Sequence, residues 1–460
     1  MDRSVTRIAP PPALWDAEVD VAVIGGGAAG LVAGLRAQEA GAEVLVLERD
    51  TTPSGSTALS SGFIPAPCTR AQRTQGIEDS PEQFASDIQA KAHGTAHPGI
   101  VETVTRRIGP AMDWLAERHG LDWVVLDDFL YPGHSRHRMH AVPEKTGAAL
   151  MTRLIGAAES AGLPIATGAH VTTLHAIGDR IAGLTLTRHD GHTETLGAKA
   201  VILACNGYGG NAELVARHIP EMTHALYFGH AGNTGDAVLW GEALGARTRD
   251  LSAYQGHGSV AHPHGILITW ALMMEGGIQV NAAGQRFSNE HEGYSEQAVR
   301  VLAQPDGIAW CVFDQRIHEF ALGFPDYRAA AEAGAVMALD KAVLPAKALA
   351  LTLADVAGYA AGGQDPFGRD FTGQPPLGDS LMAIRVTGAL FHTQGGLEID
   401  AQARVIGREG TALPNLFASG GAACGVSGAR VEGYLSGNGL LTAVALGFVA
   451  GRHAAETAER

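Results

Sequence analysis

The 460-residue chain contains only four cysteines, and their spacing matches no known paired site. Cys68, Cys205, Cys311 and Cys424 are isolated from one another, so the spacings of zinc sites, haem attachment and iron–sulfur clusters are all missing. Dispersed thiols are typical of proteins in a reducing compartment. We therefore expect neither a metal centre nor a disulfide framework.

Two further shortages limit where the protein acts and what it binds. No run of about eighteen uncharged apolar residues occurs, and residues 1–15 have no apolar signal core. Lys and Arg number 33 against 48 Asp and Glu, and the net charge of −15 disfavours nucleic acid and anionic membranes as partners. The sequence predicts a large cytoplasmic enzyme with a small-molecule substrate, long enough for two domains.

Glycine, by contrast, is abundant, with 60 residues, and its most informative cluster lies near the N-terminus. Residues 21–50 give an apolar strand, a glycine turn, a helix, a second strand and an acid, in the order of a dinucleotide-binding fingerprint. Gly25 permits the tight turn, Gly27 lets the backbone approach a pyrophosphate, and Gly30 lets the helix pack closely on the sheet. The phosphates are expected at the helix N-terminus.

The acid at the end of the second strand, Glu48, can accept hydrogen bonds from both ribose hydroxyls, which argues against a 2′-phosphorylated cofactor. Later segments favour flavin over nicotinamide. These are hydroxyl-rich or glycine-rich segments that follow apolar strands or open an apolar helix, at 54–62, 206–211, 416–420 and 437–439. No second strand–GxGxxG–helix unit follows, so a separate nicotinamide site is not visible and the electron acceptor stays open.

Seven blocks of sequence now point to a family. They are GGGAAG at 25–30, STALSSG at 56–62, LACNGYGGN at 203–211, NTGDA at 233–237, GGIQVNAAGQRFSNE at 276–290, FHTQGGLEID at 391–400 and LPNLFASGGAACGVSG at 413–428. Over nearly its whole length the chain resembles the fumarate reductase/succinate dehydrogenase flavoprotein family, which includes the 3-ketosteroid dehydrogenases.

The resemblance implies an α/β fold with a discontinuous, Rossmann-like FAD-binding domain and an inserted α+β capping domain. The expected FAD-binding segments are 1–249 and 392–460, and the capping, substrate-covering domain is expected at 250–391. Within the cap, the alanine-rich run 328–362 predicts helices broken near Pro345.

The resemblance also implies FAD as the cofactor. Succinate dehydrogenases attach their flavin to a histidine, and residues 51–62 contain none, so we expect FAD to be held non-covalently. The residues that the resemblance places around FAD are Gly25, Gly27, Ala28, Ala29, Gly30, Glu48, Arg49, Ser56, Thr57, Ser61, Gly62, Val171, Ala204, Asn206, Gly207, Asp236, Gly420, Ser436, Asn438 and Leu440.

Members of this family pass a hydride between a substrate carbon and flavin N5 and exchange a proton at the adjacent carbon. His257 and His392 match the histidines that bind the substrate carboxylate or carbonyl oxygen in fumarate reductases. Each can donate a hydrogen bond to an oxygen that becomes enolate-like in the transition state.

A departure from the fumarate reductases follows Glu290. Their proton-delivering arginine stands four residues after this glutamate, where the chain has Tyr294, and the places of its two relay partners fall on Trp270 and Met273. Ketosteroid dehydrogenases carry a tyrosine at the position of Tyr294, which takes a proton from the carbon next to the one that loses hydride. Because a free tyrosine has a pKa near 10, this role needs a C–H acidified by a polarised carbonyl and a phenol stabilised as phenolate. The alternative is an aromatic packing residue.

Three further residues are candidates for substrate contact. Tyr434 lies near the position of the carbonyl-polarising tyrosine of ketosteroid dehydrogenases, whereas its neighbour Arg430 would suit a carboxylate clamp, and the two stay open as alternatives. Tyr131 precedes a basic run at 134–140 that either assists a base, attracts an anion or is a solvated loop.

The sequence therefore predicts an FAD-dependent dehydrogenase, or desaturase, that introduces a C=C bond α,β to a carbonyl in a small, cyclic keto compound or oxo acid. A fumarate reductase-like ene-reductase acting on an unsaturated acid is the alternative. A flavin-binding partner or redox sensor without its own substrate is a third hypothesis, which His257 and His392 disfavour.

Overall fold

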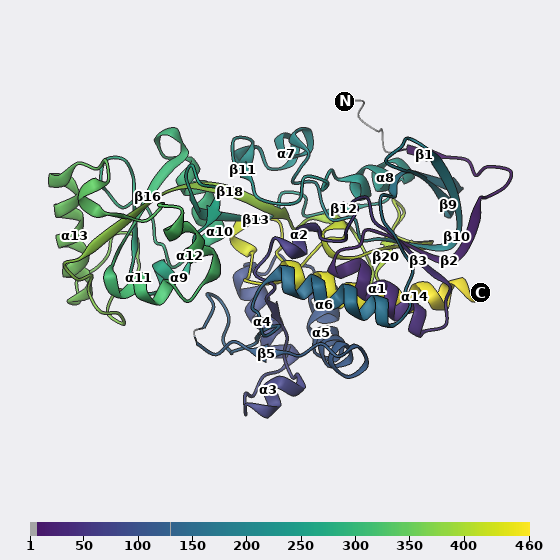
Figure 1. Ribbon diagram of the computed structural model, residues 1–460, viewed down its shortest axis with the longest axis horizontal. Coiled ribbons are helices and arrows are strands. Elements are labelled where there is room, and N and C mark those ends of the chain that lie inside the picture. Colours follow the sequence, from purple (N-terminus) through teal and green to yellow (C-terminus); the bar gives the residue numbers. More distant parts are fainter. Residues whose placement is uncertain (1–6, 129) are drawn as a thin grey trace. The chain divides into compact units, whose positions relative to one another are not determined.

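The computed structural model describes residues 7–128 and 130–460 (Figure 1). The expectation for residues 1–15 can thus be followed only from residue 7 onward. The chain divides into two compact units: the first holds the residues up to 219, 229–254 and 392–460, and the second holds 220–228 and 255–391. The mixed α/β class with a parallel sheet confirms the predicted fold class. Segment 220–228, which the division assigns to the second unit, was not singled out by the sequence.

The first unit is built on a parallel sheet with the strand order β7-β3-β2-β10-β21. Its strands are β2 (Ala17–Ile24), β3 (Val44–Leu47), β7 (Ile165–Ala166), β10 (Thr193–Leu203) and β21 (Ala412–Ala418). The apolar runs of β2, β3, β10 and β21 are largely buried, as expected for a sheet covered on both faces, whereas the two residues of β7 are half-buried. The N-terminal half of β10 also pairs with β9 in antiparallel fashion, which extends the sheet.

Further strands complete this unit. They are β1 (Arg7–Ala9), β8 (His170–Ile177), β9 (Arg180–Thr187) and β20 (Arg404–Ile406) in the same sheet, and β4 (Ile64–Pro65), β5 (Val124–Val125), β6 (Met139–Ala141), β12 (Thr248–Arg249) and β19 (Gly396–Leu397) in two small sheets.

Two long helices pack against each other beside the parallel sheet, α1 (Ala28–Glu39) and α14 (Asn438–Ala458) (Figure 1). Their approach is close because α14 presents glycine: a Cβ at Gly447 would lie 2.6 Å from the carbonyl oxygen of Ala29. The remaining helices of this unit are α2 (Gly55–Ala58), α3 (Arg70–Thr74), α4 (Pro81–Lys91), α5 (Pro98–His119), α6 (Gly147–Ser160), α7 (Ala212–His218) and α8 (Asp236–Leu244).

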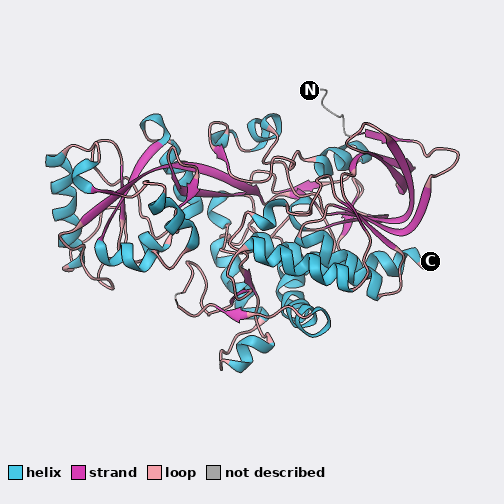
Figure 2. Ribbon diagram, in the orientation of Figure 1, coloured by secondary structure: helices cyan, strands magenta, loops and turns pink. Residues whose placement is uncertain are grey.

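The second unit has a largely antiparallel sheet with the order β14-β13-β18-β16-β15 (Figure 2). Its strands are β13 (Tyr254–Ala261), β14 (Ile266–Leu267), β15 (Ile278–Val280), β16 (Ile308–Asp314), β17 (Met337–Ala338) and β18 (Leu381–Thr393). Segment 220–228 joins this unit because β11 (Leu226–Tyr227) pairs with β18.

The helices of the second unit are α9 (Ala271–Met274), α10 (Tyr294–Leu302), α11 (Gln315–Ala321), α12 (Pro325–Glu332) and α13 (Ala346–Ala360). Pro345 stands at the N-cap of α13, so the alanine-rich run is divided as its proline suggested. Within the described part of the chain, no helix has the length and apolar character needed to cross a bilayer.

Candidate active site

The turn between β2 and α1 is fixed by close backbone contacts. Gly25 has φ +110°, and a Cβ there would lie 2.5 Å from the carbonyl oxygen of Ala204 at the end of β10. A Cβ at Gly30 would lie only 1.8 Å from the carbonyl oxygen of Gly25. Neither position has room for a side chain, so the tight turn and the helix packing expected from the sequence are both present.

Gly27 differs from these two glycines because it faces open space. A Cβ there would meet only the Thr57 hydroxyl, at 3.7 Å. Gly27 is the N-cap of α1 without a side-chain cap, the first turn has no acid, and the Ala28 amide donates to the Thr57 hydroxyl at 3.3 Å. The first turn of α1 thus keeps room and amide donors for an anion, as a pyrophosphate requires.

At the end of β3, Glu48 is held in place by backbone amides. Its carboxylate accepts from the Gly26 amide at 2.7 Å and from the Asp50 amide at 2.9 Å. The next residue, Arg49, donates to Asp236 at 2.8 Å and lies 3.1 Å from His170, the neighbour of buried Val171. The carboxylate of Asp236 thus balances the guanidinium of Arg49.

A third part of the predicted cofactor site is organised by Ser56. Its hydroxyl accepts from the side-chain amides of Asn206 at 3.2 Å and Asn233 at 2.8 Å. Asn206 has φ +65°, and its side-chain oxygen accepts from the Gly207 amide at 2.8 Å. The hydroxyl-rich segment after Glu48 and the turn after β10 therefore lie side by side.

Four more of the predicted cofactor residues lie at the N-terminus of α14 or just after β21. Gly437 is the N-cap of α14 with no side-chain cap and no acid in the first turn. Ser436 and Asn438 are buried, Leu440 is half-buried, and Gly420 lies against Ala29. Gly62 packs on Thr146, whereas Ser61 is exposed.

Two buried polar atoms in this region lack a partner among the described residues, Ser419 Oγ and Asn438 Oδ1. An unpaired buried polar atom costs about 1–3 kcal/mol, so such atoms often mark the place of a ligand. Together with the free first turns of α1 and α14, they fit a bound dinucleotide. Within the described residues, no group of three or more His, Cys, Asp or Glu is arranged to hold a metal ion.

The second unit contains a ladder of four nearly parallel rings. Phe228 stacks on Phe391 at 4.9 Å, Phe391 on His257 at 5.5 Å, and His257 on Tyr294 at 4.8 Å. Trp270 closes the ladder, edge-on to His257 at 5.7 Å. The sequence singled out His257 and Tyr294 separately, and the structure brings their rings into contact.

His257 is a neutral residue in this ladder. Burial lowers its pKa to about 3, and its Nδ1 has no partner among the described residues. Tyr294 is the first residue of α10 and is half-buried. Trp270 and Met273, at the places of the fumarate reductase proton relay, are buried apolar side chains. They supply no proton-transfer groups.

A buried ion network, which the sequence did not reveal, supports the loop before Tyr294. Glu290 pairs with Arg286 at 2.7 Å and with Arg369 at 3.1 Å, and Arg286 also pairs with Asp365. Burial opposes ionisation of Glu290, but the hydrogen bond from Arg286 and the charge of Arg369 lower its pKa overall. Asp365 and Arg369 come from a distant segment, and only the RFxNE block, which contains Arg286 and Glu290, gave any sign of this network.

In the first unit, His392 lies against Tyr434 rather than Arg430. The rings of His392 and Tyr434 meet edge-on at 5.6 Å, and Tyr434 is buried, whereas Arg430 is exposed. Burial lowers the pKa of His392 to about 4, so it is neutral near pH 7. Tyr131 is half-buried and lies edge-on to Phe63 at 6.2 Å.

The basic run after Tyr131 is only partly solvated, since Arg136 is exposed but His134, Arg138 and His140 are buried. Arg138 is fully buried and pairs with Asp79 at 2.8 Å and with Asp87. His134 is buried as well and hydrogen-bonds the Ser436 carbonyl at 3.0 Å. The interpretation of the run as a solvated or anion-attracting loop is therefore wrong for these residues, because two distant carboxylates compensate the buried charge.

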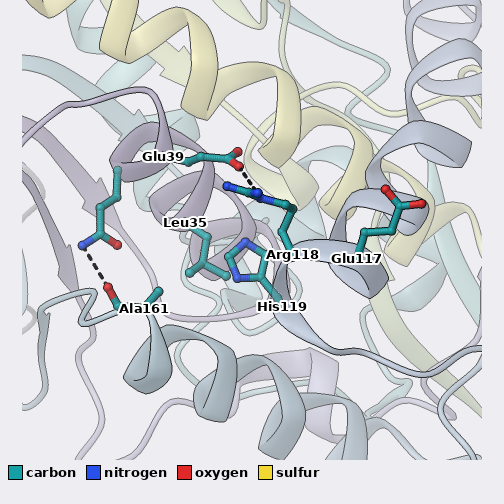
Figure 3. A pocket seen from close by; sticks show the side chains of 7 residues that line it. Leu35, Glu39, Glu117, Arg118, His119 and Ala161 are labelled. Atoms are coloured by element: carbon teal, nitrogen blue, oxygen red, sulfur yellow. Dashed lines mark hydrogen bonds and ion pairs between the residues drawn. The ribbon is translucent and has the colours of Figure 1, made fainter.

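A surface pocket at the C-terminal ends of α1, α5 and α6 is lined by none of the predicted site residues (Figure 3). Glu39 accepts from Arg118 at 3.1 Å within it. Its lining is Leu35, Gln38, Glu39, Glu117, Arg118, His119 and Ala161. Within the lining, Glu39 is thus paired with Arg118, and the Gln38 side chain donates to the Ala161 carbonyl at 3.3 Å.

Residues 20–440 match the family model described as an FAD binding domain. The chain belongs to this FAD-binding family. It is 30% identical over 449 residues to the probable fumarate reductase Ifc3 of Shewanella frigidimarina (strain NCIMB 400), covering 95% of this chain and 75% of that protein. It is 25% identical to the 4-oxocyclohexanecarboxylate 2-dehydrogenase of Sinomonas cyclohexanicum, covering 96% of each.

Among solved structures, the chain resembles 3-ketosteroid-Δ4-(5α)-dehydrogenase from Rhodococcus jostii RHA1 with a TM-score of 0.77 and 25% identity, covering 98% of this chain and 99% of that one. The predicted membership of the fumarate reductase/succinate dehydrogenase flavoprotein family is confirmed. The protein is accordingly an FAD-dependent oxidoreductase of the class that acts on CH–CH groups and C=C bonds.

Proposed function

We propose that the protein is a dehydrogenase that introduces a C=C bond α,β to the carbonyl of a small, cyclic keto compound or oxo acid, with non-covalently held FAD. The observation that carries the proposal is the stacked pair of Tyr294 and neutral His257, whose neighbour Trp270 stands at a relay position of the fumarate reductases.

Bound FAD supplies the hydride acceptor at flavin N5. The residues of the chain handle the proton and the oxygen. Tyr294, as its phenolate, accepts the proton from the carbon next to the carbonyl and becomes the neutral phenol. The neighbouring carbon gives up the hydride, so the substrate loses a proton and a hydride, which together carry two electrons. Removal of that proton needs an acidified C–H, because a phenolate is a weak base toward carbon.

The histidines fit a ketone better than a dicarboxylate. His257 and His392, with pKa values lowered to about 3 and about 4, are neutral near pH 7 and offer hydrogen bonds but no positive charge. A neutral donor can stabilise the enolate-like oxygen of a carbonyl substrate. Tyr434, buried beside His392, supplies a second hydroxyl suited to the same oxygen. The exposed position of Arg430 weakens its candidacy as a carboxylate clamp.

The relatives support two directions of reaction. Similarity to the 4-oxocyclohexanecarboxylate 2-dehydrogenase over 96% of both chains favours the desaturase. The 30% identity to a probable fumarate reductase favours the alternative, an ene-reductase for an unsaturated acid. The apolar residues Trp270 and Met273 at the relay positions lead us to prefer the first.

Anaerobic titration of the holoenzyme separates the two functions. We expect cyclic ketones and oxocyclohexanecarboxylates to bleach the oxidised flavin, and Tyr294→Phe to slow that bleaching. Reoxidation of chemically reduced flavin by an unsaturated acid, with no bleaching by any saturated ketone, would establish the reductase instead.

A further inference from the structure

Three buried polar side chains form a series of hydrogen bonds that leads to His392. The proposed role of His392 in binding the substrate does not account for this series. Asn438 donates through Nδ2 to the hydroxyl of Ser427 at 3.0 Å. The Ser427 hydroxyl donates to Gln394 Oε1 at 2.8 Å. The amide nitrogen of Gln394 lies 3.0 Å from His392 Nδ1. All four residues belong to the first unit.

The hydrogen bonds of this series all run in one direction, with each donor on the side of Asn438 and each acceptor on the side of His392. The Ser427 hydroxyl accepts a hydrogen bond from Asn438 and donates its own to the oxygen of Gln394, which can only accept. The nitrogen of Gln394 is then left facing the imidazole, and an amide nitrogen can only donate. Nδ1 of His392 must therefore accept, and its proton resides on Nε2.

Burial makes this arrangement effective. Gln394 is 5% exposed, Ser427 1% and Asn438 0%, so water has little access to replace any link. Hydrogen bonds in such an environment strengthen one another, and a broken link leaves a buried group unpaired. The Thr393 carbonyl, 3.3 Å from the same Nδ1, would favour the opposite tautomer but is the longer contact.

Glycine packs against the other edge of the ring. A Cβ at Gly439 would lie 2.9 Å from His392 Nε2, closer than a side chain can pack, so a residue without a side chain is needed there. Tyr434 is a titratable side chain that meets the ring edge-on at 5.6 Å, and burial is the main cause of the lowered pKa of His392. Because Nδ1 faces Gln394, Nε2 is the nitrogen left for a ligand.

We propose that Gln394 is a positioning residue which, supported by Ser427 and Asn438, fixes His392 as the neutral tautomer with its proton on Nε2. His392 then serves as a permanent hydrogen-bond donor to the oxygen of the substrate, whose chemical class is a carbonyl compound or a carboxylic acid. The role in catalysis rests on the proposed function, but the tautomer itself does not, because it exists without substrate.

The direct test reads the tautomer in the FAD-loaded enzyme. Protein labelled with ¹⁵N in its histidine rings is examined by long-range ¹H–¹⁵N correlation between pH 5 and 8, and the His392 signals are identified by their loss in His392→Asn. We expect a protonated Nε2 and an unprotonated Nδ1 throughout. A protonated Nδ1 in the wild type would overturn the proposal, whichever substrate the enzyme proves to use.

Gln394→Glu should reverse the tautomer. A carboxylate accepts where the amide donated, so the imidazole should carry its proton on Nδ1 when neutral, and its pKa should rise. Flavin reduction by substrate should then fall by roughly a hundredfold at high pH, as for loss of an oxyanion donor. It should recover as the pH is lowered, because the imidazolium regains a proton on Nε2. KM should change much less than kcat.

Two companion variants keep the test decisive. Ser427→Ala removes the hydrogen bond that orients the Gln394 amide and should give a mixture of His392 tautomers. It replaces Gln394→Glu as the test variant if Gln394→Glu fails to retain FAD. Gln75→Glu adds the same charge at an exposed site of the same unit and should leave the tautomer and the pH profile unchanged. Wild-type tautomer and pH profile in folded Gln394→Glu and Ser427→Ala would refute the role of Gln394.

Discussion

At the scale of single residues, Tyr294 separates this chain from the fumarate reductases that it otherwise resembles. Tyr294→Phe keeps the ring and its stacking on His257 at 4.8 Å but removes the hydroxyl. We expect FAD to stay bound and the rate of flavin reduction to fall by roughly two to four orders of magnitude, the range of general acid–base catalysis. Stopped-flow absorbance of the flavin measures this rate.

The matched control is Tyr359→Phe, on α13 of the same unit, which should reduce the flavin at the wild-type rate. Solvent deuterium incorporation at the substrate α-carbon should fall together with flavin reduction in Tyr294→Phe if proton removal comes first. Near-normal reduction in that variant would eliminate Tyr294 as the base and transfer the role to Tyr131 or Tyr434.

His257 gives a second residue-scale prediction. Because burial holds its pKa at about 3, it acts as a neutral hydrogen-bond donor across the physiological pH range. His257→Ala should lower flavin reduction by roughly a hundredfold, with no recovery at low pH. The exposed His264→Ala in the same unit is the control. Equal rates in wild type and His257→Ala would make His257 a packing residue of the aromatic ladder.

The sequence predicted which single residues belong to the candidate site, but not which side chains contact them. Matched motifs singled out His257 and His392, yet no motif linked Gln394 to Ser427 and Asn438, since their contacts depend on the folded path of distant segments. The prediction of a solvated or anion-attracting loop around Arg138 was wrong for the same reason. The carboxylate partners of Arg138 are 51 and 59 residues away, so the local sequence shows only positive charge.

At the scale of elements, the strand–turn–helix–strand unit in residues 21–50 could be predicted from the sequence, because its glycines, its apolar periodicity and its terminal acid are local signals. The structure has β2, α1 and β3 at 17–24, 28–39 and 44–47. The two-residue strand β11 was not predictable, since so short a segment has no periodicity of its own. Its strand character comes from pairing with β18.

Substitutions in the glycine turn can separate folding of the apoprotein from binding of FAD. A Cβ at Gly27 would meet Thr57 Oγ1 at 3.7 Å, an ordinary contact distance, so Gly27→Val should fold as apoprotein. It should nevertheless lose FAD, because the added methyl groups obstruct the approach of the pyrophosphate. FAD content is measured as flavin released per protein after acid precipitation.

Gly30→Ala provides the contrast, since its Cβ would lie 1.8 Å from a backbone oxygen in the same turn. This variant should lose thermal stability even as apoprotein. Full flavin retention by Gly27→Val would show that the phosphates do not approach the backbone there. Release of FMN or NADP from the wild type would overturn the cofactor assignment.

At the scale of the whole molecule, five histidines share a lowered pKa. Loss of solvent contact is the main cause that lowers the pKa of each from 6.5 to about 3 or about 4. His134, His140 and His257 are buried, whereas His291 and His392 are half-buried, and the five are spread over both compact units. Such a set couples the stability of each unit to pH.

The sign of this coupling follows from proton binding. Between pH 6.5 and about 4 the unfolded chain protonates these histidines while the folded protein does not, so the unfolded state binds more protons and stability falls as the pH is lowered. Each histidine contributes a slope of about 1.4 kcal/mol per pH unit in this window. Above pH 6.5 neither state binds these protons, and their contribution to the slope vanishes.

We therefore expect the free energy of unfolding, measured with urea on the apoprotein, to be nearly flat from pH 8 to 7 and to fall steeply from pH 6.5 to 4.5. Carboxylates whose pKa is lowered by folding, such as Glu290, act in the same direction. They act mainly below pH 4.5, since the pKa of an unfolded Glu lies there.

His140→Asn removes one buried titrating ring without touching the proposed site. The pH slope of its free energy of unfolding should therefore be shallower than that of the wild type by the contribution of about one proton. The exposed His264→Asn should keep the wild-type slope. A stability that stays constant from pH 7 to 4.5 would mean that these histidines ionise in the folded protein, and it would remove the basis for treating His257 and His392 as neutral donors.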